Sequence, residues 1–222
     1  MTLTELVAFY LELTATHLSP YKSSSDANNV SYLNRAYDRI ARYIRYFDPK
    51  IAWTLTASTK EYAMSSTTIF SKRVIKPYNV YLNSQEIRLY SLKEFTDRYT
   101  DYRWNDTAGT PTVAYWHGGT LGLHVKPDSS AAAYTCYVSG ECLPVPLSAS
   151  SMSSVPDIPA DLHESIAYLA AIYSSESTAS DEVALLKLKT YSSQALIDLN
   201  IARDRNEELI LGSFENEEEY IS

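Results

Sequence analysis

The stretch from 160 to 203 constrains this sequence most, because it contains neither glycine nor proline. Pro159 directly before it suits the first position of a helix, where its missing N–H would be unpaired in any case. The apolar residues that follow recur at the spacing of one amphipathic helix face, namely Leu162, Ile166, Leu169, Ala170 and Tyr173. The hydroxyl-rich run 174–180 interrupts them, since short hydroxyl side chains compete for backbone hydrogen bonds. We therefore predict a helical hairpin over 157–203.

The second helix of this hairpin has a clear start signal. Ser180 or Asp181 is suited to cap it. Its predicted inner face carries Leu185, Leu188, Ser192, Ala195, Leu196 and Leu199. Such a hairpin has one apolar face and needs a partner to pack against.

The N-terminal region supplies that partner. Helical spacing predicts a first helix over 2–16, followed by a polar loop over 19–29. A second helix, capped by Asn28 or Asn29, is predicted to end at Phe47, because Asp48-Pro49 stops it. Its buried face would carry Leu33, Ala36, Tyr37, Ile40, Ile44 and Phe47.

Between the two helix pairs, the apolar period changes to that of strands. Strands are predicted over 51–56, 62–64, 74–82, 86–90, 113–117, 120–126 and 132–138. Asn83-Ser84 and Gly118-Gly119 would form tight turns, and Pro77 predicts a sheet edge or a bulge. Ser91 and Glu94 have capping-box spacing, which predicts a short helix over 92–99. The serine- and proline-rich run 143–156 is interpreted as an extended connection.

These patterns predict an α+β fold. Its core would be an antiparallel four-helix bundle made from the N- and C-terminal helix pairs, with an inserted antiparallel β-rich region and a short helix. The expected divisions are 1–48 and 157–203 for the bundle, 49–156 for the β-rich insertion and 204–222 for an acidic tail.

Charge is distributed unevenly along the chain. The formal net charge is −8, which argues against general nucleic-acid affinity. Residues 35–103 carry 13 basic and 7 acidic side chains, a net of +6, whereas 204–222 carry 7 acidic and 1 basic, a net of −6. Such asymmetry favours an interaction surface.

Cellular location is indicated by three absences in the sequence. Cys136 and Cys142 flank a predicted turn at Ser139-Gly140 and lack metal-site spacing, so free thiols from a reducing compartment are expected. Glu5 and Glu12 interrupt the first apolar run, so no signal peptide is expected. No stretch approaches the roughly 20 apolar residues of a membrane span.

Catalytic and metal-binding motifs are not found, so we predict no enzymatic activity, no cofactor and no metal. The histidines are interpreted as structural or exposed: His17, His117, His124 and His163. His163, in the first turn of a helix, could bond to the preceding loop or face solvent. Gly118-Gly119 lacks the lysine and helix that phosphate binding requires.

Nineteen tyrosines suit subunit interfaces, because each buries a ring and keeps a wet hydroxyl. An alternative use of tyrosine rings is a surface in the β-rich region on which sugar rings stack.

Two surfaces are candidate interaction sites. Arg35, Arg39 and Arg42 recur on the far side of the second helix and are either a solvated basic face or an inter-subunit contact for carboxylates. The acidic tail also contains apolar residues, as in segments that fold on binding: Leu209, Ile210, Leu211, Phe214 and Tyr220. A frayed, solubilising terminus is the alternative for the tail.

The order of several motifs resembles a known family. Tyr32-Leu33-Asn34 opens a helix with Ile40-Ala41-Arg42, and Trp104 precedes Gly109-Thr110-Pro111-Thr112 and Tyr115. Lys126-Pro127 then ends a strand, and Val155-Pro156-Asp157-Ile158-Pro159 leads into Leu162-His163-Glu164. Over roughly residues 2–200, this order resembles the adaptor, or head-completion, proteins in the neck of tailed bacteriophages.

The resemblance implies a structural role. It implies a homo-oligomeric ring, dodecameric, that lies under the portal, extends the DNA channel and connects capsid to tail. The implied partners are the portal protein, a stopper or tail (nozzle) protein, and viral DNA that passes without sequence recognition; no membrane is involved. The implied location is the neck of the virion, assembled in the cytoplasm of a bacterial host. An alternative is a tail-associated glycan-binding structural protein that uses the tyrosine-rich β-region. A third candidate is a neck protein with added peptidoglycan hydrolase activity, for which the sequence offers no recognisable acid/base pair.

Overall fold

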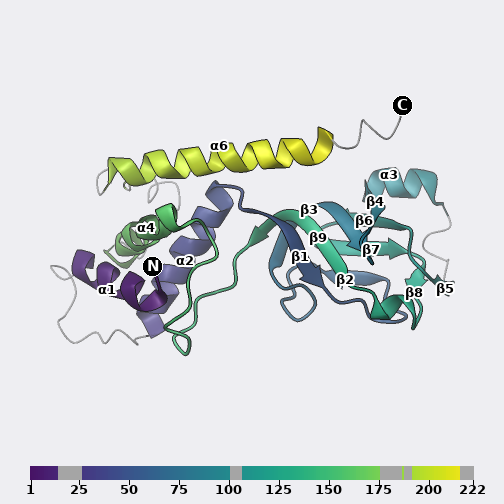
Figure 1. The fold of residues 1–222 in the computed structure, drawn as a ribbon, viewed down its shortest axis with the longest axis horizontal. Coiled ribbons are helices and arrows are strands. Elements are labelled where there is room, and N and C mark those ends of the chain that lie inside the picture. The colour runs from purple at the N-terminus through teal and green to yellow at the C-terminus, as the bar shows by residue number, and fades with distance from the viewer. Residues whose placement is uncertain (15–26, 101–106, 176–186, 188–191, 216–222) are drawn as a thin grey trace. The chain divides into compact units, whose positions relative to one another are not determined.

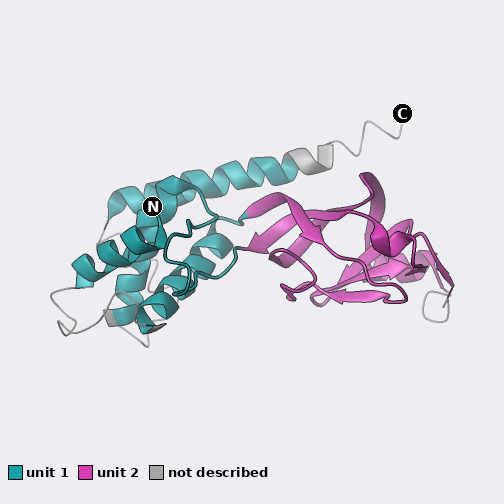
Figure 2. Cartoon of the chain, turned by 60° about the horizontal axis from the view of Figure 1, so that its bottom comes forward, with its two compact units in different colours: residues 1–46, 144–211 teal, residues 47–143, 212–222 magenta. Residues whose placement is uncertain are grey.

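The structure is a computed structural model that describes residues 1–14, 27–100, 107–175, 187 and 192–215 (Figure 1). It divides into two compact units (Figure 2). Unit 1 comprises Met1–Tyr46 and Pro144–Leu211, and unit 2 comprises Phe47–Leu143 with Gly212–Ser222. Unit 1 is helical and unit 2 contains the sheet.

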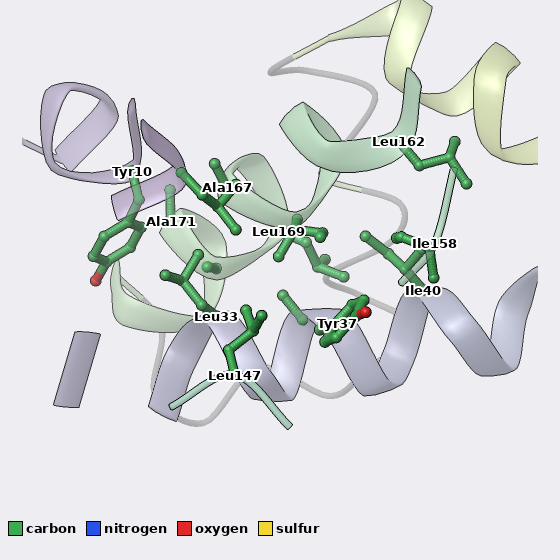
Figure 3. Packing of buried hydrophobic residues seen from close by; sticks show 14 of the residues in the cluster. Tyr10, Leu33, Tyr37, Ile40, Leu147, Ile158, Leu162, Ala167, Leu169 and Ala171 are labelled. Carbon is green, nitrogen blue, oxygen red and sulfur yellow. The ribbon is translucent and has the colours of Figure 1, made fainter. Parts of the chain in front are cut away.

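Unit 1 is built around three helices, α1 (Leu3–Thr14), α2 (Ala27–Tyr43) and α4 (His163–Ser175). Their apolar faces form one core, which Figure 3 shows at close range. A fourth helix, α6 (Ser193–Glu215), adds Ala195, Leu199 and Ala202 to it. Completely buried members of this core include Leu3, Leu6, Leu33, Ile40, Leu162, Ile166 and Leu169.

α2 ends earlier than predicted. The sequence suggested a helix through Phe47, but Arg45 adopts a left-handed φ of 50°. The Arg45 N–H donates to the Arg42 carbonyl and the Tyr46 N–H to the Ala41 carbonyl, at 3.3 and 2.8 Å. This is a Schellman closure, a motif that usually contains glycine. Because Arg45 occupies that position, the sequence carried no visible stop signal before Pro49.

The connection after Pro144 is extended only in part, because the N–H groups of Ser151 and Ser154 donate to the carbonyls of Ser148 and Ser151, at 2.9 and 3.0 Å, and form turns. It is fixed to the helices. Leu3 and Thr4 at the start of α1 donate their N–H groups to the carbonyls of Ser154 and Met152, at 2.8 and 3.0 Å. The side chain of Asn34 both donates to and accepts from the backbone of Leu147, at 2.9 and 2.7 Å. The connection therefore satisfies donors at a helix end that would otherwise be unpaired.

α6 begins later than the predicted second helix of the hairpin. Ser192 precedes it, and the Ser192 Oγ accepts from the Ala195 N–H at 3.1 Å, as an N-cap does. The predicted start at Ser180 or Asp181 lies outside the described residues, as do Leu185 and Leu188 of the predicted inner face. The helix continues through the acidic region that was expected to form a separate tail, up to Glu215.

Unit 2 contains a seven-stranded sheet in the order β1-β9-β3-β4-β6-β7-β2. A short two-stranded sheet pairs β5 with β8. The strands are β1 (Phe47–Trp53), β2 (Glu61–Ala63), β3 (Arg73–Leu82), β4 (Gln85–Ser91), β5 (Ala108–Gly109), β6 (Val113–His117), β7 (Thr120–His124), β8 (Lys126–Pro127) and β9 (Cys136–Leu143).

The sheet is mixed because α3 (Leu92–Arg98) crosses between β4 and β6, which pair in parallel. Parallel neighbours need such a crossover. The predicted capping box is confirmed: the Glu94 N–H donates to Ser91 Oγ at 3.4 Å, and Glu94 Oε2 accepts from the Ser91 N–H at 3.0 Å. A local motif at Ser91 therefore starts the helix that determines the direction of β6.

Both predicted tight turns are confirmed. Asn83 and Ser84 have φ of 50° and 65°, and Gly118 and Gly119 have φ of 50° and 83°. Two consecutive left-handed residues are typical of the type I′ turn, whose twist matches that of the flanking strands. Pro77 lies at a register shift in central strand β3, so it occupies a bulge, as predicted.

The turn predicted at Ser139-Gly140 is wrong, and the strand predicted over 132–138 is present but begins later, at Cys136. Residues 131–133 form a 3-10 helix, and β9 continues unbroken through Gly140. A Cβ atom on Gly140 would lie 2.3 Å from the Lys76 carbonyl oxygen on β3. Gly140 therefore allows β3 and β9 to approach closely at a bulge. In the sequence alone, a glycine with this role cannot be distinguished from one in a turn.

The segment 64–74 links both edges of the sheet. Val74 N–H donates to the Met64 carbonyl just after β2, at 2.9 Å. Beside β1, Ser71 N–H donates to Ala52 at 2.8 Å and Thr54 N–H donates to Ile69 at 3.0 Å. The sheet is thus curled, with hydrogen-bonding partners at both edge strands, which reduces exposure of unpaired backbone groups.

The predicted fold class is wrong. The structure is not a four-helix bundle with a small antiparallel β insertion, because unit 2 is a large mixed sheet of seven strands. The parallel β4–β6 pair depends on the α3 crossover, and the continuity of β9 depends on Gly140. Both are relations between segments distant in sequence, which the periodicity of single segments does not reveal.

Candidate interaction surfaces

The predicted arginine face lies on α2, opposite its buried residues. Arg35 and Arg42 are exposed and Arg39 is half-buried. The guanidinium carbon of Arg35 lies 3.9 Å from the centroid of the buried Tyr173 ring on α4, a cation–π contact. Arg39 Nε is shielded from solvent and has no hydrogen-bond acceptor in the described part of the chain. The three arginines share one helix face but differ in environment.

The next arginine in the chain follows α2 and contacts α6. Arg45 lies 3.9 Å from the Glu207 carboxylate, and both side chains are partly exposed. Asn206 Nδ2 donates to the Ile44 carbonyl at 2.8 Å, and Tyr43 OH donates to Asn200 Oδ1 at 2.7 Å. These contacts fix α6 against the C-terminal end of α2.

The predicted docking residues of the tail do not form one surface. Leu209 and Leu211 are 52% and 62% exposed, whereas Ile210 between them is 4% exposed and belongs to the buried side of α6. Phe214 lies within α6, but its side chain is outside the described residues, and so is the whole of Tyr220. Of the five predicted docking residues, Leu209 and Leu211 are the two whose side chains the structure describes as exposed.

Sequence reasoning missed an exposed face of α6. Ile197 and Ile201 are each 50% exposed, although isoleucines in a helix of unit 1 would be expected in the core. With Asp204, Glu208 and Leu211 they follow a spacing of four, three, four and three residues. That heptad spacing, readable from the sequence, is typical of a helix that packs along another helix. The predicted inner face obscured it, because Leu196 and Leu199 of that face alternate with Ile197 and Ile201 along the sequence.

His163 has a structural role in unit 1. Its Nδ1 accepts from the Met1 amino group at 2.9 Å and its Nε2 donates to the Ile158 carbonyl at 3.0 Å, so the ring is neutral with its proton on Nε2. Burial lowers the pKa of His163, and the positive charge of Met1 lowers it further. The predicted bond to the preceding loop is confirmed.

His117 and His124 contact different residues of unit 2. The ring of His124 packs edge-on against Tyr99 and Phe95, with centroids 4.6 and 5.6 Å apart. His117 Nε2 lies 3.8 Å from the Glu61 carboxylate, which also accepts from Tyr115 OH at 2.9 Å. His17 lies outside the described residues. Among the described residues, no three His, Cys, Asp or Glu side chains form a potential metal site.

Both cysteines are free and buried, as expected. Burial raises the pKa of the Cys136 thiol to about 11, which suppresses its reactivity. Cys136 and Cys142 lie six residues apart on the continuous strand β9, so their Cα atoms are roughly 20 Å apart at about 3.3 Å per residue. A disulfide needs less than about 7 Å. The two thiols therefore cannot pair within one chain.

Tyrosines of unit 2 serve mainly in packing. Tyr62 and Tyr115 are buried, and Phe95 stacks on Tyr115 with centroids 4.4 Å apart. Elsewhere, cationic groups cover tyrosine faces: Lys50 lies 4.5 Å from the Tyr137 centroid and Arg98 lies 5.0 Å from that of Tyr90.

In the described part of the chain, no helix combines the length and the apolar character needed to cross a membrane. No curated protein matches the chain. The family model described as SU10 adaptor protein matches residues 1–209. This match confirms the predicted resemblance and spans both units. The chain therefore belongs to the SU10 adaptor protein family, a family of structural adaptor proteins of bacteriophages.

Proposed function

We propose that this chain is the subunit of a homo-oligomeric ring, dodecameric, that lies beneath the portal of a tailed phage. The ring extends the DNA channel and connects the capsid to a stopper or tail protein. Membership of the SU10 adaptor family over residues 1–209 is the observation that carries this proposal. The role requires binding surfaces and a passage, and it requires no chemical step.

The charge of the chain supports passive transit of DNA. A net charge of −8 makes general retention of phosphate groups unfavourable, whereas a lumen lined with lysine would release counterions and bind the duplex. The DNA would therefore move through the ring without sequence-specific contacts.

The end of α6 is proposed to dock onto the portal protein or an adjacent subunit. Leu209 and Leu211 are exposed on a helix end that carries acidic residues, and Phe214 and Tyr220 continue the apolar pattern. Ile210 contributes by holding the helix, since it is buried. Exposed leucines flanked by charge are typical of a segment that binds a partner surface.

A truncation that spares the fold tests this docking. Asn206 and Ile210 belong to the packing of α6, so removal of everything after Asp204 would disturb unit 1 as well. Deletion of 212–222 combined with Leu209→Ser leaves those contacts in place. We expect it to abolish binding to the portal, measured by co-sedimentation. Unchanged binding would contradict the docking role.

The arginine face is proposed to form inter-subunit ion pairs through Arg35, Arg39 and Arg42. Exposed pairs contribute only about 0–1 kcal/mol each. Triple substitution to alanine should therefore loosen the ring measurably and leave the subunit folded. Ring stability that is identical in wild type and variant, at low and high salt, would exclude this role.

Unit 2 is proposed to contact the next component downstream, the stopper or tail protein, in the neck of the virion. The whole assembly would form in the host cytoplasm. Negative-stain imaging of the purified chain, alone and with portal rings, tests the overall function. A ring that caps the portal is the expected result. Portal rings that remain bare at saturating chain concentration would overturn the proposed function.

A further inference from the structure

We infer that the exposed face of α6 binds the arginine face of α2 on a second copy of this chain. The inference rests on the proposed ring and names the two surfaces that join its subunits. The outer α6 face is defined by Ile197, Ile201, Asp204, Glu208 and Leu211. The α2 arginine face is defined by Arg35, Arg39 and Arg42.

The inner side of α6 is fully occupied by unit 1. Ala195, Leu199 and Ala202 are buried in the shared core, and Asn206 binds the Ile44 carbonyl at 2.8 Å. Ile197 and Ile201 each lie two positions from Leu199, which is about 200° around a helix of 3.6 residues per turn. The outer α6 face therefore points away from the α2 of its own chain. Figure 1 shows α6 along one side of the other helices of unit 1.

The spacing and composition of the outer α6 face suit a helical partner. Its members recur every three or four residues, as in the seam of a coiled coil. Ile197, Ile201 and Leu211 are 50%, 50% and 62% exposed, and the two carboxylates lie between the isoleucines and the leucine. A single exposed apolar residue is ordinary. Three along one heptad seam indicate a surface that a second helix covers.

Charge selects the partner. α6 carries five acidic and two basic residues, a net of −3, whereas α2 carries three arginines and one aspartate, a net of +2. Asp204 and Glu208 stand four residues apart, about 6 Å along the helix, and so do Arg35 and Arg39. The planar guanidinium group suits paired hydrogen bonds to carboxylates. The Nε of Arg39 lacks an acceptor among the described residues.

Two different faces of one subunit produce a particular symmetry. The outer α6 face of one copy meets the α2 arginine face of the next, so the contact is heterologous, head to tail. Such contacts close into rings when the rotation between copies permits it. The inferred contact is therefore of the kind that a homo-oligomeric ring needs.

Charge reversal on each face tests the pairing. The first variant is Arg39→Glu/Arg42→Glu, which leaves the Arg35–Tyr173 contact intact. The second is Asp204→Lys/Glu208→Lys. The third combines all four substitutions in one chain. Glu12→Lys/Asp97→Lys is the matched control, because it makes the same charge change as the second variant at the C-terminal ends of two other helices, where lysine is favourable. Far-UV circular dichroism and tryptophan fluorescence establish folding.

Self-association is measured by analytical ultracentrifugation across concentration, and ring formation by imaging on the portal. Each two-residue reversal should raise the dissociation constant at least about tenfold, because it opposes like charges in the interface. The four-residue variant should recover affinity, and so should an equimolar mixture of the first two variants, in which opposite charges face each other again. The control should behave as wild type.

The outcomes separate this inference from the proposed function. If the wild type and every charge variant all form rings on the portal, the proposed function stands, and the pairing of these two faces is overturned. Loss in both reversals without recovery in the four-residue variant or in the mixture would also overturn it. Bare portals with the wild-type chain would overturn the proposed function itself. A reversal that fails to fold is replaced by Arg39→Gln/Arg42→Gln, for which a smaller loss of affinity is expected and wild-type affinity would contradict the pairing.

Discussion

The two units differ in their glycine content. Unit 1 contains none in Met1–Tyr46 or Pro144–Leu211, whereas the sheet of unit 2 contains five between Gly109 and Gly140. A Cβ on Gly122 would lie 2.1 Å from Cζ of Tyr115, and one on Gly140 would lie 2.3 Å from the Lys76 carbonyl oxygen. The helical unit is thus specified by side chains that fill space, and the sheet unit also by positions where no side chain fits.

The cores of the units differ as well. The core of unit 1 is mainly aliphatic, with alanines at close helix contacts, whereas unit 2 contains stacked aromatic rings such as Trp53 on Phe70, with centroids 5.5 Å apart. All three tryptophans lie between 47 and 143. Tryptophan fluorescence therefore follows unit 2, while the helical signal of circular dichroism follows mostly unit 1, so the two signals report on different units during unfolding.

The largest expected effect comes from removing an aromatic ring of unit 2. Phe95 is completely buried and lies between Tyr115 and Tyr99, with centroids 4.4 and 5.0 Å away. Phe95→Ala should lower the free energy of unfolding of unit 2 by about 3–5 kcal/mol. Denaturant titration followed by tryptophan fluorescence measures it. The helical transition should move little; an equal shift of both transitions would show that the units do not unfold independently.

A truncation in the core of unit 1 tests from the other side whether the two units unfold independently. Leu33 on α2 is completely buried among aliphatic neighbours. Leu33→Ala should cost about 2–5 kcal/mol, because it leaves a cavity in a packed core. The loss should show in the helical signal of circular dichroism, with the fluorescence transition unchanged. A shift confined to fluorescence would contradict the assignment of this core to unit 1.

The next largest loss of stability is expected from adding a methyl group at a glycine of the sheet. Gly140→Ala would force the β3 backbone away from β9, and overpacking of this kind costs typically about 1–3 kcal/mol. The fluorescence-detected unfolding midpoint should fall. Gly109→Ala is the matched control, because its Cβ would meet only Val125 Cγ1 at 3.4 Å, an ordinary contact. Equal effects at both glycines would argue against the role of close approach.

The capping box should contribute less. Ser91→Ala removes the side chain that accepts from the Glu94 N–H and should cost about 1 kcal/mol. The same fluorescence titration measures this loss. Ser91→Thr keeps a hydroxyl and should restore most of the stability; a Thr variant as weak as Ala would contradict the capping role.

The smallest effect at neutral pH concerns His163 in unit 1. Its pKa is lowered in the folded state, so the unfolded chain binds more protons as the pH falls below the ordinary value of about 6.5. The stabilisation is complete above that pH and is lost progressively below it. The free energy of unfolding of unit 1, followed by the helical signal of circular dichroism, should therefore fall from pH 7 to pH 5. His163→Gln should flatten this dependence, and an equally steep profile in that variant would assign it to other groups.

Local signals in the sequence were sufficient for several features. The Ser91–Glu94 capping box, the turn at Asn83-Ser84, the Gly118-Gly119 hairpin and the bulge at Pro77 were all predicted and are confirmed. Each depends on the conformational preference of two to four neighbouring residues. The order of motifs along the chain also predicted the adaptor family, which the family match confirms.

Other features needed distant partners and were missed. α2 ends at Tyr43, and Arg45 just after it has a left-handed conformation that glycine usually adopts. Ser139-Gly140 resembled a turn because the bulge of β3 against it comes from another part of the sequence. The exposed face of α6 with Ile197 and Ile201 was not recognised, since the sequence does not reveal which side of a long helix the remainder of unit 1 covers.

The sequence by itself determined the local elements, their turns and caps, and the family. Only the tertiary structure decided that the strands form one curled mixed sheet of seven, and that α6 buries Leu199 while exposing Ile197 and Ile201. The physical reason is the range of the interactions. Backbone preferences and hydrophobic periods act within a few residues, whereas strand order and the choice of a buried helix face depend on contacts between segments far apart in the chain.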